Sequence, residues 1–363
     1  MADSMDSPSQ RREARRINDA INAELKKEKA AAASLRGPKI LLLGSADSGK
    51  TTVLKQMKIL HGDGFSMDER LAFRHRIMDN ILDSMRALID ALNYLDIDWG
   101  EKENEELGKI VKASVERVLD GSLPPEVVKA IRTLWKDGGI QACYKRSNEF
   151  FIQDTADYFL GNISKFTTKD YVPTDEGFLS EVEGGDILRT RFRTTSITET
   201  RFKIDRFIYR MYDVGGQRSD RLCWAPFFES EIHAILFIVS LASYDQMLVE
   251  DPTINRMLDA LVLFETVSNN PLLKKVNIIL FLNKADLFER KLKQTSVKRY
   301  FPDYDGGNDV KSAAKYFRKK FQDQNKTPEK KVYTHFTTGT DTSNMKAVIA
   351  AVRYIPVPFL TTG

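Results

Sequence analysis

The stretch that decides the fold is LLLGSADSGKTT, residues 41–52. An apolar run ends at Gly44, four residues follow, and Gly49, Lys50 and Thr51 complete the spacing G-x-x-x-x-G-K-[ST]. In a loop of this spacing the backbone amides surround phosphate oxygens, the lysine reaches the terminal phosphates and the hydroxyl holds magnesium. The stretch therefore predicts a strand, a phosphate-binding loop and a helix. The predicted nucleotide ligands of the loop are consecutive: Asp47, Ser48, Gly49, Lys50, Thr51 and Thr52.

The composition is that of a soluble globular protein. Of 363 residues, 42% are hydrophobic and 29% are charged, and the length suffices for two ordinary domains. The longest apolar runs lie at 234–242 and 276–283. They are much shorter than the roughly 20 residues that a membrane-spanning helix needs, so we expect them to be buried parallel strands.

Secretion and nucleic-acid binding are both disfavoured. Residues 1–16 lack the apolar core of a signal peptide. The two cysteines, Cys143 and Cys223, are too few for a disulfide framework or a cysteine-based zinc site, so a reducing, cytoplasmic setting is expected. The net charge is only +4, and basic residues are spread along the chain. A nucleic-acid function would require a concentrated basic stripe, so no nucleic acid is expected as a partner.

The spacing of apolar residues divides the chain into two kinds of structure. From about residue 66 to 165, apolar residues such as Ile77, Ile81 and Met85 recur three or four positions apart, which is typical of helices. After residue 200, apolar strands alternate with helices, which indicates a mostly parallel sheet covered on both faces. The sequence thus predicts an α/β fold, with a sheet domain formed by residues 39–64 and 188–353. An all-helical domain with its linkers is inserted between them, at residues 65–187.

The first 38 residues are expected to form an N-terminal amphipathic helix. Ile17, Ile21 and Leu25 follow one another at four-residue spacing among charged residues, which gives a narrow apolar stripe. Two interpretations remain open. The helix lies against a partner or a membrane surface, or it packs loosely on its own domain.

A second motif places phosphate and metal ligands after an expected strand. In DVGG, residues 213–216, the carboxylate of Asp213 can hold magnesium through water. Gly216 can offer its backbone amide to a terminal phosphate. The order of the two motifs along the chain favours one shared phosphate site.

Two further motifs are suited to a guanine base. In NKAD, which includes Asn283 and Lys284, the carboxylate of Asp286 can accept two hydrogens from N1 and the exocyclic amine of guanine. Adenine cannot supply these in that arrangement, and the Asn283 amide can bond N7. In TTGT, residues 337–340, the amide of Gly339 can reach the guanine carbonyl. Because each motif ends a strand, phosphates, metal and base are all expected along one edge of the sheet.

In the combination of these motifs, the chain resembles the alpha subunits of heterotrimeric G proteins over about residues 35–353. Besides the helical insert, the resemblance rests on KRSNEF, DILRTRFRTTSI, DVGGQRSDR and YTHFTTGTDT, at 145–150, 186–197, 213–221 and 333–342. It implies a Ras-like P-loop GTPase fold and a signal-transducing switch that binds GTP or GDP with Mg²⁺ and hydrolyses GTP slowly. It also implies four partners: a beta-gamma dimer, a seven-helix receptor, an effector enzyme and GTPase-activating regulators. These partners place the chain at the inner face of the plasma membrane.

The resemblance also assigns roles to individual residues. Arg191 matches the family's built-in arginine finger, and Gln217 matches the residue that orients the attacking water. If the resemblance is left aside, Arg191 fits a solvated basic loop equally well, since Arg189 and Arg193 flank it. Thr194 matches the second magnesium hydroxyl, beside that of Thr51 and the water-mediated carboxylate of Asp213. The remaining predicted nucleotide contacts are Asp154, Leu188 and Arg189.

Both ends of the chain depart from the family pattern. The chain begins Met-Ala-Asp and has no cysteine before Cys143, so no lipidation motif is visible. At the other end, Pro356 and Pro358 prevent a regular helix in the atypical tail, residues 354–363. Receptor coupling through that tail is therefore in question.

Three departures lie closer to the chemistry. Ala46 occupies a loop position where the family usually has glycine, and its methyl group is expected to crowd Gln217. The connector EGFLSEVEGG, residues 176–185, is longer than its counterpart in the family. Leu222 and Cys223 stand where the family usually has two lysines on the surface that binds beta-gamma.

Two alternatives remain open beside the main interpretation. One is a nucleotide-binding switch of the same fold with impaired hydrolysis or impaired receptor coupling, which Ala46 and the longer connector favour. The other is a metabolic P-loop kinase, which a preference for GTP over ATP would exclude.

Overall fold

The computed structural model describes Asn22 and residues 38–114, 121–175, 185–194, 196–204 and 207–353. Three predicted segments lie outside these residues. They are nearly all of the N-terminal helix expected over 1–38, the connector at 176–184 and the tail at 354–363.

Within the described residues, six strands form one sheet: β1 (Lys39–Leu43), β2 (Thr198–Ile204), β3 (Phe207–Asp213), β4 (Ala234–Ser240), β5 (Asn277–Asn283) and β6 (Val332–Phe336). Their order across the sheet is β2-β3-β1-β4-β5-β6. Only β2 runs antiparallel to its neighbour, while the other four pairings are parallel. The predicted mostly parallel sheet is therefore confirmed.

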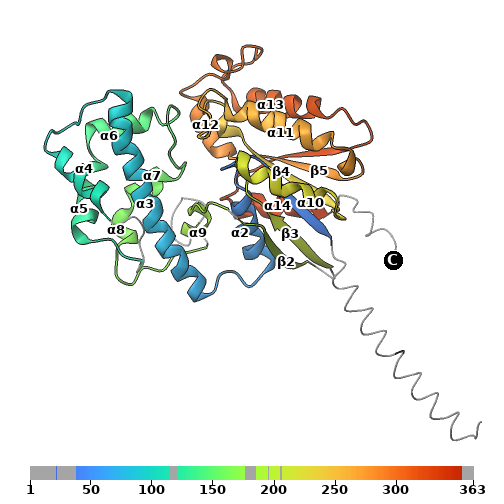
Figure 1. Ribbon diagram of the computed structural model, residues 1–363, viewed down its shortest axis with the longest axis horizontal. Helices are drawn as coiled ribbons and strands as arrows, with labels where there is room; N and C mark the ends of the chain where they lie inside the picture. Colours follow the sequence, from blue (N-terminus) through green and yellow to red (C-terminus); the bar gives the residue numbers. More distant parts are fainter. Residues whose placement is uncertain are drawn as a thin grey trace, which may run out of the picture.

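Helices cover both faces of this sheet: α2 (Lys50–His61), α11 (Arg256–Ser268), α12 (Ala285–Leu292), α13 (Val310–Gln324) and α14 (Thr342–Arg353). Figure 1 shows α11, α12 and α13 together on one side of the sheet. Because side chains of a strand alternate between faces, β1 contributes to two cores. Leu41 and Leu43 belong to the core that contains residues of α11, α12 and α13. Ile40 and Leu42 belong to the core that contains residues of α2 and α14.

A separate group of helices follows α2: α3 (Met67–Leu95), α4 (Asn104–Ala113), α5 (Pro125–Leu134), α6 (Gly138–Lys145), α7 (Ala156–Gly161) and α8 (Ile163–Phe166). Figure 1 shows them gathered to one side of the sheet. They share a hydrophobic core of their own, in which Ile77, Ile81 and Met85 are fully buried. The helix predicted from the spacing of these residues is therefore confirmed. At the start of α3, Ser66 and Glu69 form a capping box, which satisfies amides that a helix leaves free at its first turn.

Short elements make the remaining connections: α9 (Asp186–Arg189), η1 (Arg218–Trp224), α10 (Ala225–Phe228), η2 (Leu241–Ser243), η3 (Pro271–Leu273) and η4 (Val297–Arg299). The loops after β1, β3, β5 and β6 leave the carboxyl ends of parallel strands, so they meet at one edge of the sheet. All four predicted motifs lie on these loops. Among the described residues, no helix is long and apolar enough to cross a membrane.

Candidate functional site

A cavity of about 410 Å³ lies where the sheet edge, the helical group and the segment after α9 meet. This size suits a small-molecule ligand. All but one of the residues predicted to contact nucleotide, phosphate or metal line it: Asp47, Ser48, Gly49, Lys50, Thr51, Thr52, Asp154, Leu188, Arg189, Arg191, Thr194, Gly216, Gln217, Asn283, Lys284, Asp286 and Gly339. The exception is Asp213, which is buried beneath the cavity and bonded to Thr51.

The phosphate loop has the backbone that its sequence predicts. Gly49 adopts φ +103°, and a side chain there would come within 2.3 Å of the Asn283 amide nitrogen. Lys50 Nζ donates to the carbonyls of Gly44 and Ser45, each at 2.9 Å. Burial lowers the pKa of Lys50 to about 8, although Asp213 opposes that change. An anion held by the loop would favour the charged form of this lysine.

Gly216 approaches the phosphate loop closely. A Cβ atom at this position would lie 2.3 Å from Lys50 Nζ and 2.6 Å from the Gly44 carbonyl oxygen. Only glycine therefore allows the loop after β3 to pack against the loop after β1. This close approach brings the backbone of the DVGG motif beside the lysine that is predicted to hold phosphate.

Three oxygen-bearing side chains converge at the start of α2. The Thr51 hydroxyl donates to Asp213 Oδ2 at 2.9 Å and lies 3.0 Å from the Thr194 hydroxyl. Asp213 is 2% exposed, and its other oxygen, Oδ1, has no hydrogen-bond partner among the described residues. Burial raises the pKa of Asp213, so this site favours a nearby cation. Hydroxyl and carboxylate oxygens are the ligands that Mg²⁺ prefers, so the residues present fit this ion.

Arg191 is held at the cavity rather than in a solvated loop. Its Nε donates to Asp47 Oδ1 at 2.6 Å, and its guanidinium lies 4.9 Å from the centre of the Phe151 ring. Arg256 also pairs with Asp47, at 3.5 Å. Burial alone would raise the pKa of Asp47, but Arg256 and Arg191 bring it below its ordinary value. The loop thus carries a charged carboxylate that restrains two arginines.

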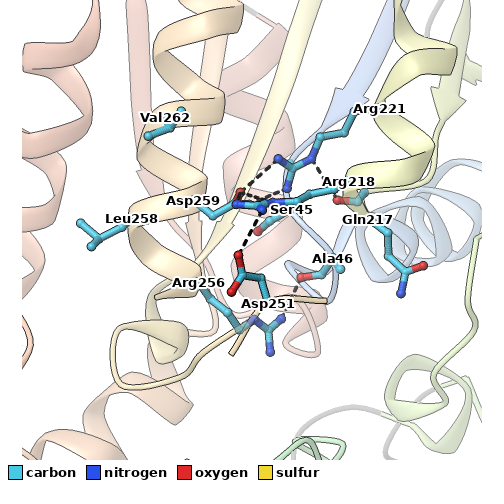
Figure 2. Close-up of polar contacts among 12 residues, drawn as sticks. Ser45, Ala46, Gln217, Arg218, Arg221, Asp251, Arg256, Leu258, Asp259 and Val262 are labelled. Carbon is cyan, nitrogen blue, oxygen red and sulfur yellow. Dashed lines mark hydrogen bonds and ion pairs between the residues drawn. The ribbon is translucent and has the colours of Figure 1, made fainter. Parts of the chain in front are cut away.

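Gln217 lines the cavity, and its Oε1 accepts a hydrogen bond from Arg193 Nη2 at 2.5 Å. The next residues are anchored elsewhere. Arg221 and Arg218 donate to the buried carboxylate of Asp259 on α11, at 2.5 and 3.2 Å. Figure 2 shows Gln217 pointing away from this cluster. The segment after β3 is therefore fixed on α11 while its glutamine stays near the surface.

The predicted base-binding residues also hold the site together. Asn283 Nδ2 donates to the Ser48 carbonyl at 2.9 Å, and its Oδ1 accepts from the Gly339 amide at 3.0 Å. The Gly339 amide is engaged in this way here, so its contact with a guanine carbonyl stays a prediction. Lys284 Nζ donates to Asp154 Oδ2 at 2.5 Å, which joins the sheet edge to the helical group.

The pKa of Asp154 reflects this pairing. Burial alone would raise it, but Lys284 holds it at about 2. Asp154 is therefore ionised at neutral pH, and the pair closes one side of the cavity.

Sequence reasoning missed three residues that organise the site. Lys55 Nζ donates to the carbonyls of Ile187 and Thr190, at 2.9 and 2.6 Å, and so fastens the segment that leads to Arg191. Arg256 Nη2 donates to the Ala46 carbonyl at 2.8 Å, as Figure 2 shows. The side chain of Asn80, on α3, bonds the backbone of Arg191. These residues belong to no local motif. Lys55 alone carried a signal in the sequence, because it stands between the apolar residues of the run 53–57, where a charged side chain needs a partner.

Comparison with known proteins identifies the family. The family model for the G-protein alpha subunit matches residues 15–356. The chain is 43% identical to the G-protein complex alpha subunit gpaA of Aspergillus fumigatus over 344 residues, which cover 95% of this chain and 94% of that protein. It is 42% identical to the guanine nucleotide-binding protein alpha-1 subunit of Neurospora crassa, over 96% of this chain and 95% of that one.

These matches extend over nearly the whole chain, and they agree with the parallel sheet, the helical group and the cavity between them. They confirm the resemblance drawn from the motifs. The chain belongs to the family of heterotrimeric G-protein alpha subunits, which bind guanine nucleotide, hydrolyse GTP and act in signal transduction.

Proposed function

We propose that this G-protein alpha subunit is inactive with GDP, becomes active by exchange for GTP, and is reset by a slow hydrolysis in which Arg191 and Gln217 act. The observation that carries the proposal is the convergence of these two side chains on one cavity with Lys50 and Thr51. In this proposal residues 39–64 and 188–353 form the GTPase domain and residues 65–187 form the inserted helical domain. The cavity between them holds the nucleotide.

The nucleotide would be held at its two ends by different loops. Backbone amides of residues 47–52 and of Gly216 would surround the phosphates, and Lys50 would reach the terminal ones. Asp286 would read the guanine edge. Asp154, Leu188 and Arg189 would cover the nucleotide from the side of the helical group, which explains why the cavity is lined from both parts of the molecule.

Mg²⁺ would be held by the hydroxyls of Thr51 and Thr194, with Asp213 acting through water. When bound, the ion neutralises charge on the phosphate oxygens. The hydroxyls already lie together at 3.0 Å, so little rearrangement of these side chains is required. The buried, unbonded oxygen of Asp213 supports this assignment.

Both catalytic side chains must leave their present partners to act. Arg191 would part from Asp47 and place its charge where negative charge develops as the terminal phosphoryl group leaves. Gln217 would part from Arg193, and its amide can then accept a hydrogen bond from the attacking water and donate one to the reacting group. These contacts with Asp47 and Arg193 hold the two side chains at the rim of the site until GTP is present.

The partners in this proposal are a beta-gamma dimer, a seven-helix receptor, an effector enzyme and GTPase-activating regulators. The name of the Aspergillus fumigatus relative describes a subunit of a G-protein complex, which supports the beta-gamma assignment. Leu222 is 84% exposed and Cys223 is exposed, so both are available to a partner on the segment that follows Gln217. Through these partners the chain would act at the cytoplasmic face of the plasma membrane.

Replacing Asp213 with asparagine tests the metal assignment. We expect the affinity for Mg²⁺ to fall by about 10- to 100-fold, because a neutral amide supports the metal-bound water less well than a carboxylate. The measurement is phosphate release in a single turnover, from preloaded GTP, as a function of Mg²⁺ concentration. Asp245→Asn is the matched control, since Asp245 is equally buried but pairs with Lys291 outside the site. Equal Mg²⁺ midpoints for wild type and Asp213→Asn would contradict the assignment.

The alternative with impaired hydrolysis is favoured by one observation, the position of Ala46. Its carbonyl is fixed by Arg256, and both Ala46 and Gln217 line the cavity. We expect Ala46→Gly to speed single-turnover hydrolysis about fivefold, because relief of crowding by one methyl group is worth about 1 kcal/mol. On a Gln217→Leu background the same change should have no effect. Equal rates for wild type and Ala46→Gly would show that the methyl group does not hinder Gln217.

A further inference from the structure

Asn80 is a polar residue in the middle of a long helix. It lies halfway along α3, is 5% exposed, and has mostly apolar buried neighbours on that helix. Asparagine is a poor helix former, because its side chain competes for backbone hydrogen bonds. Neither helix stability nor core packing explains its presence there.

The side chain of Asn80 bonds twice to the backbone of a single residue, Arg191. Its Oδ1 accepts from the Arg191 amide at 2.8 Å, and its Nδ2 donates to the Arg191 carbonyl at 3.3 Å. These two residues are 111 positions apart in the sequence. Because Arg191 lies outside any helix or strand, no regular secondary structure supplies partners for its backbone. The carboxamide of Asn80 supplies these partners instead.

The contacts of Arg191 are therefore divided between two parts of the molecule. Asn80 holds its backbone and Phe151 lies 4.9 Å from its guanidinium, and both belong to the helical segment of the chain. Asp47 of the phosphate loop holds the end of its side chain. When Arg191 leaves Asp47 to reach phosphate, the backbone clamp is the contact that can persist and define where the side chain starts.

We propose that Asn80 is a positioning residue for Arg191, which fixes the backbone from which the guanidinium reaches the terminal phosphate. The inference rests on the proposed catalytic role of Arg191. It means that α3 contributes to GTP hydrolysis although Asn80 does not line the nucleotide cavity. Separation of α3 from the Arg191 segment would then slow hydrolysis even with the nucleotide still bound.

The test compares Asn80→Leu and Asn80→Ala with wild type. Leucine keeps the branching at Cγ and is a better helix former, so it removes the two hydrogen bonds without weakening α3. We expect phosphate release in a single turnover to slow by about 10- to 100-fold, because a displacement of about 1 Å in a catalytic group has effects of this size. Affinity for GTP should change less than about threefold, since the lost contact acts through the transition state.

Ser84→Ala is the matched control. Ser84 lies one turn further along α3, is 2% exposed, and its hydroxyl has no hydrogen-bond partner among the described residues. The Ser84→Ala variant should hydrolyse GTP at the wild-type rate. Thermal unfolding of the GDP-bound variants reports whether each is folded. If Ser84→Ala slows hydrolysis as much as Asn80→Leu, general repacking of α3 accounts for the effect and the inference is overturned.

Arg191→Cys, alone and combined with Asn80→Leu, separates this inference from the proposed function. We expect the double variant to hydrolyse GTP no more slowly than Arg191→Cys alone, because Asn80 acts only through that arginine. If Arg191→Cys is as fast as wild type, the proposed catalytic role fails. If Arg191→Cys is slow and Asn80→Leu is not, only the role of Asn80 fails. Equal slowing by Asn80→Leu in both backgrounds would also overturn that role.

Discussion

Replacing Arg191 with cysteine is expected to slow GTP hydrolysis by about 10³-fold or more. This chain belongs to the G-protein alpha subunits. In such subunits and in small GTPases, an arginine finger contributes about 10³ to 10⁵ in rate. The physical reason is that a fixed cation offsets charge that develops only as the phosphoryl group leaves, so its loss affects the transition state more than the bound nucleotide. GTP should therefore still bind to Arg191→Cys with nearly the wild-type affinity.

The measurement is single-turnover phosphate release from bound GTP, which does not depend on nucleotide exchange. Arg201→Cys serves as the control, because Arg201 is an exposed arginine on β2 that pairs with Glu199 away from the cavity. It should release phosphate at the wild-type rate. If Arg191→Cys does so as well, the chain has no working arginine finger, and the alternative of a switch with impaired hydrolysis gains support.

The fold was predictable because its signals are local. The central strands β1, β4 and β5 are short, mostly apolar runs, and the helical spacing of Ile77, Ile81 and Met85 corresponds to one buried face of α3. The order of the motifs along the chain then predicted that their loops would meet. Parallel strands bring their carboxyl ends to one edge, so sequence order alone was enough to assemble Lys50, Gly216 and Asp286 around a cavity.

The parts of the site that escaped prediction are contacts between distant residues. Asn80, Lys55 and Arg256 all bond backbone carbonyls or amides, and such contacts place no demand on the type of residue at the other end. Arg191 and Gln217 were found through the family resemblance, since a basic run and a single glutamine carry no signal of their own. The tight contacts Arg191–Asp47 and Gln217–Arg193 depend on loop conformation, which spacing in the sequence does not specify.

The second large effect is expected on nucleotide binding, from a substitution of Asp286, the residue predicted to bind the guanine base. Asp286 lies in the first turn of α12 and lines the cavity. In the part of the chain that the structure describes, no hydrogen bond or ion pair engages its carboxylate, so both oxygens are available to a ligand. A carboxylate accepts hydrogen bonds at both oxygens, whereas an asparagine amide accepts at one end and donates at the other. Guanine presents two donors side by side, its N1–H and its exocyclic amine, and therefore matches the carboxylate.

We therefore expect Asp286→Asn to bind GTP about 10²- to 10⁴-fold more weakly, since two hydrogen bonds to a charged group contribute about 1.5–3 kcal/mol each. Xanthine carries a carbonyl oxygen in place of the amine, so it pairs one donor and one acceptor with the amide of the variant. Competition between GTP and xanthosine triphosphate should favour GTP for wild type and xanthosine triphosphate for Asp286→Asn. Glu289→Gln, on the same helix but outside the cavity, removes the same charge and should leave the GTP preference intact. Unchanged GTP affinity in Asp286→Asn would mean that another group reads the base, and a preference of wild type for ATP would reopen the kinase alternative.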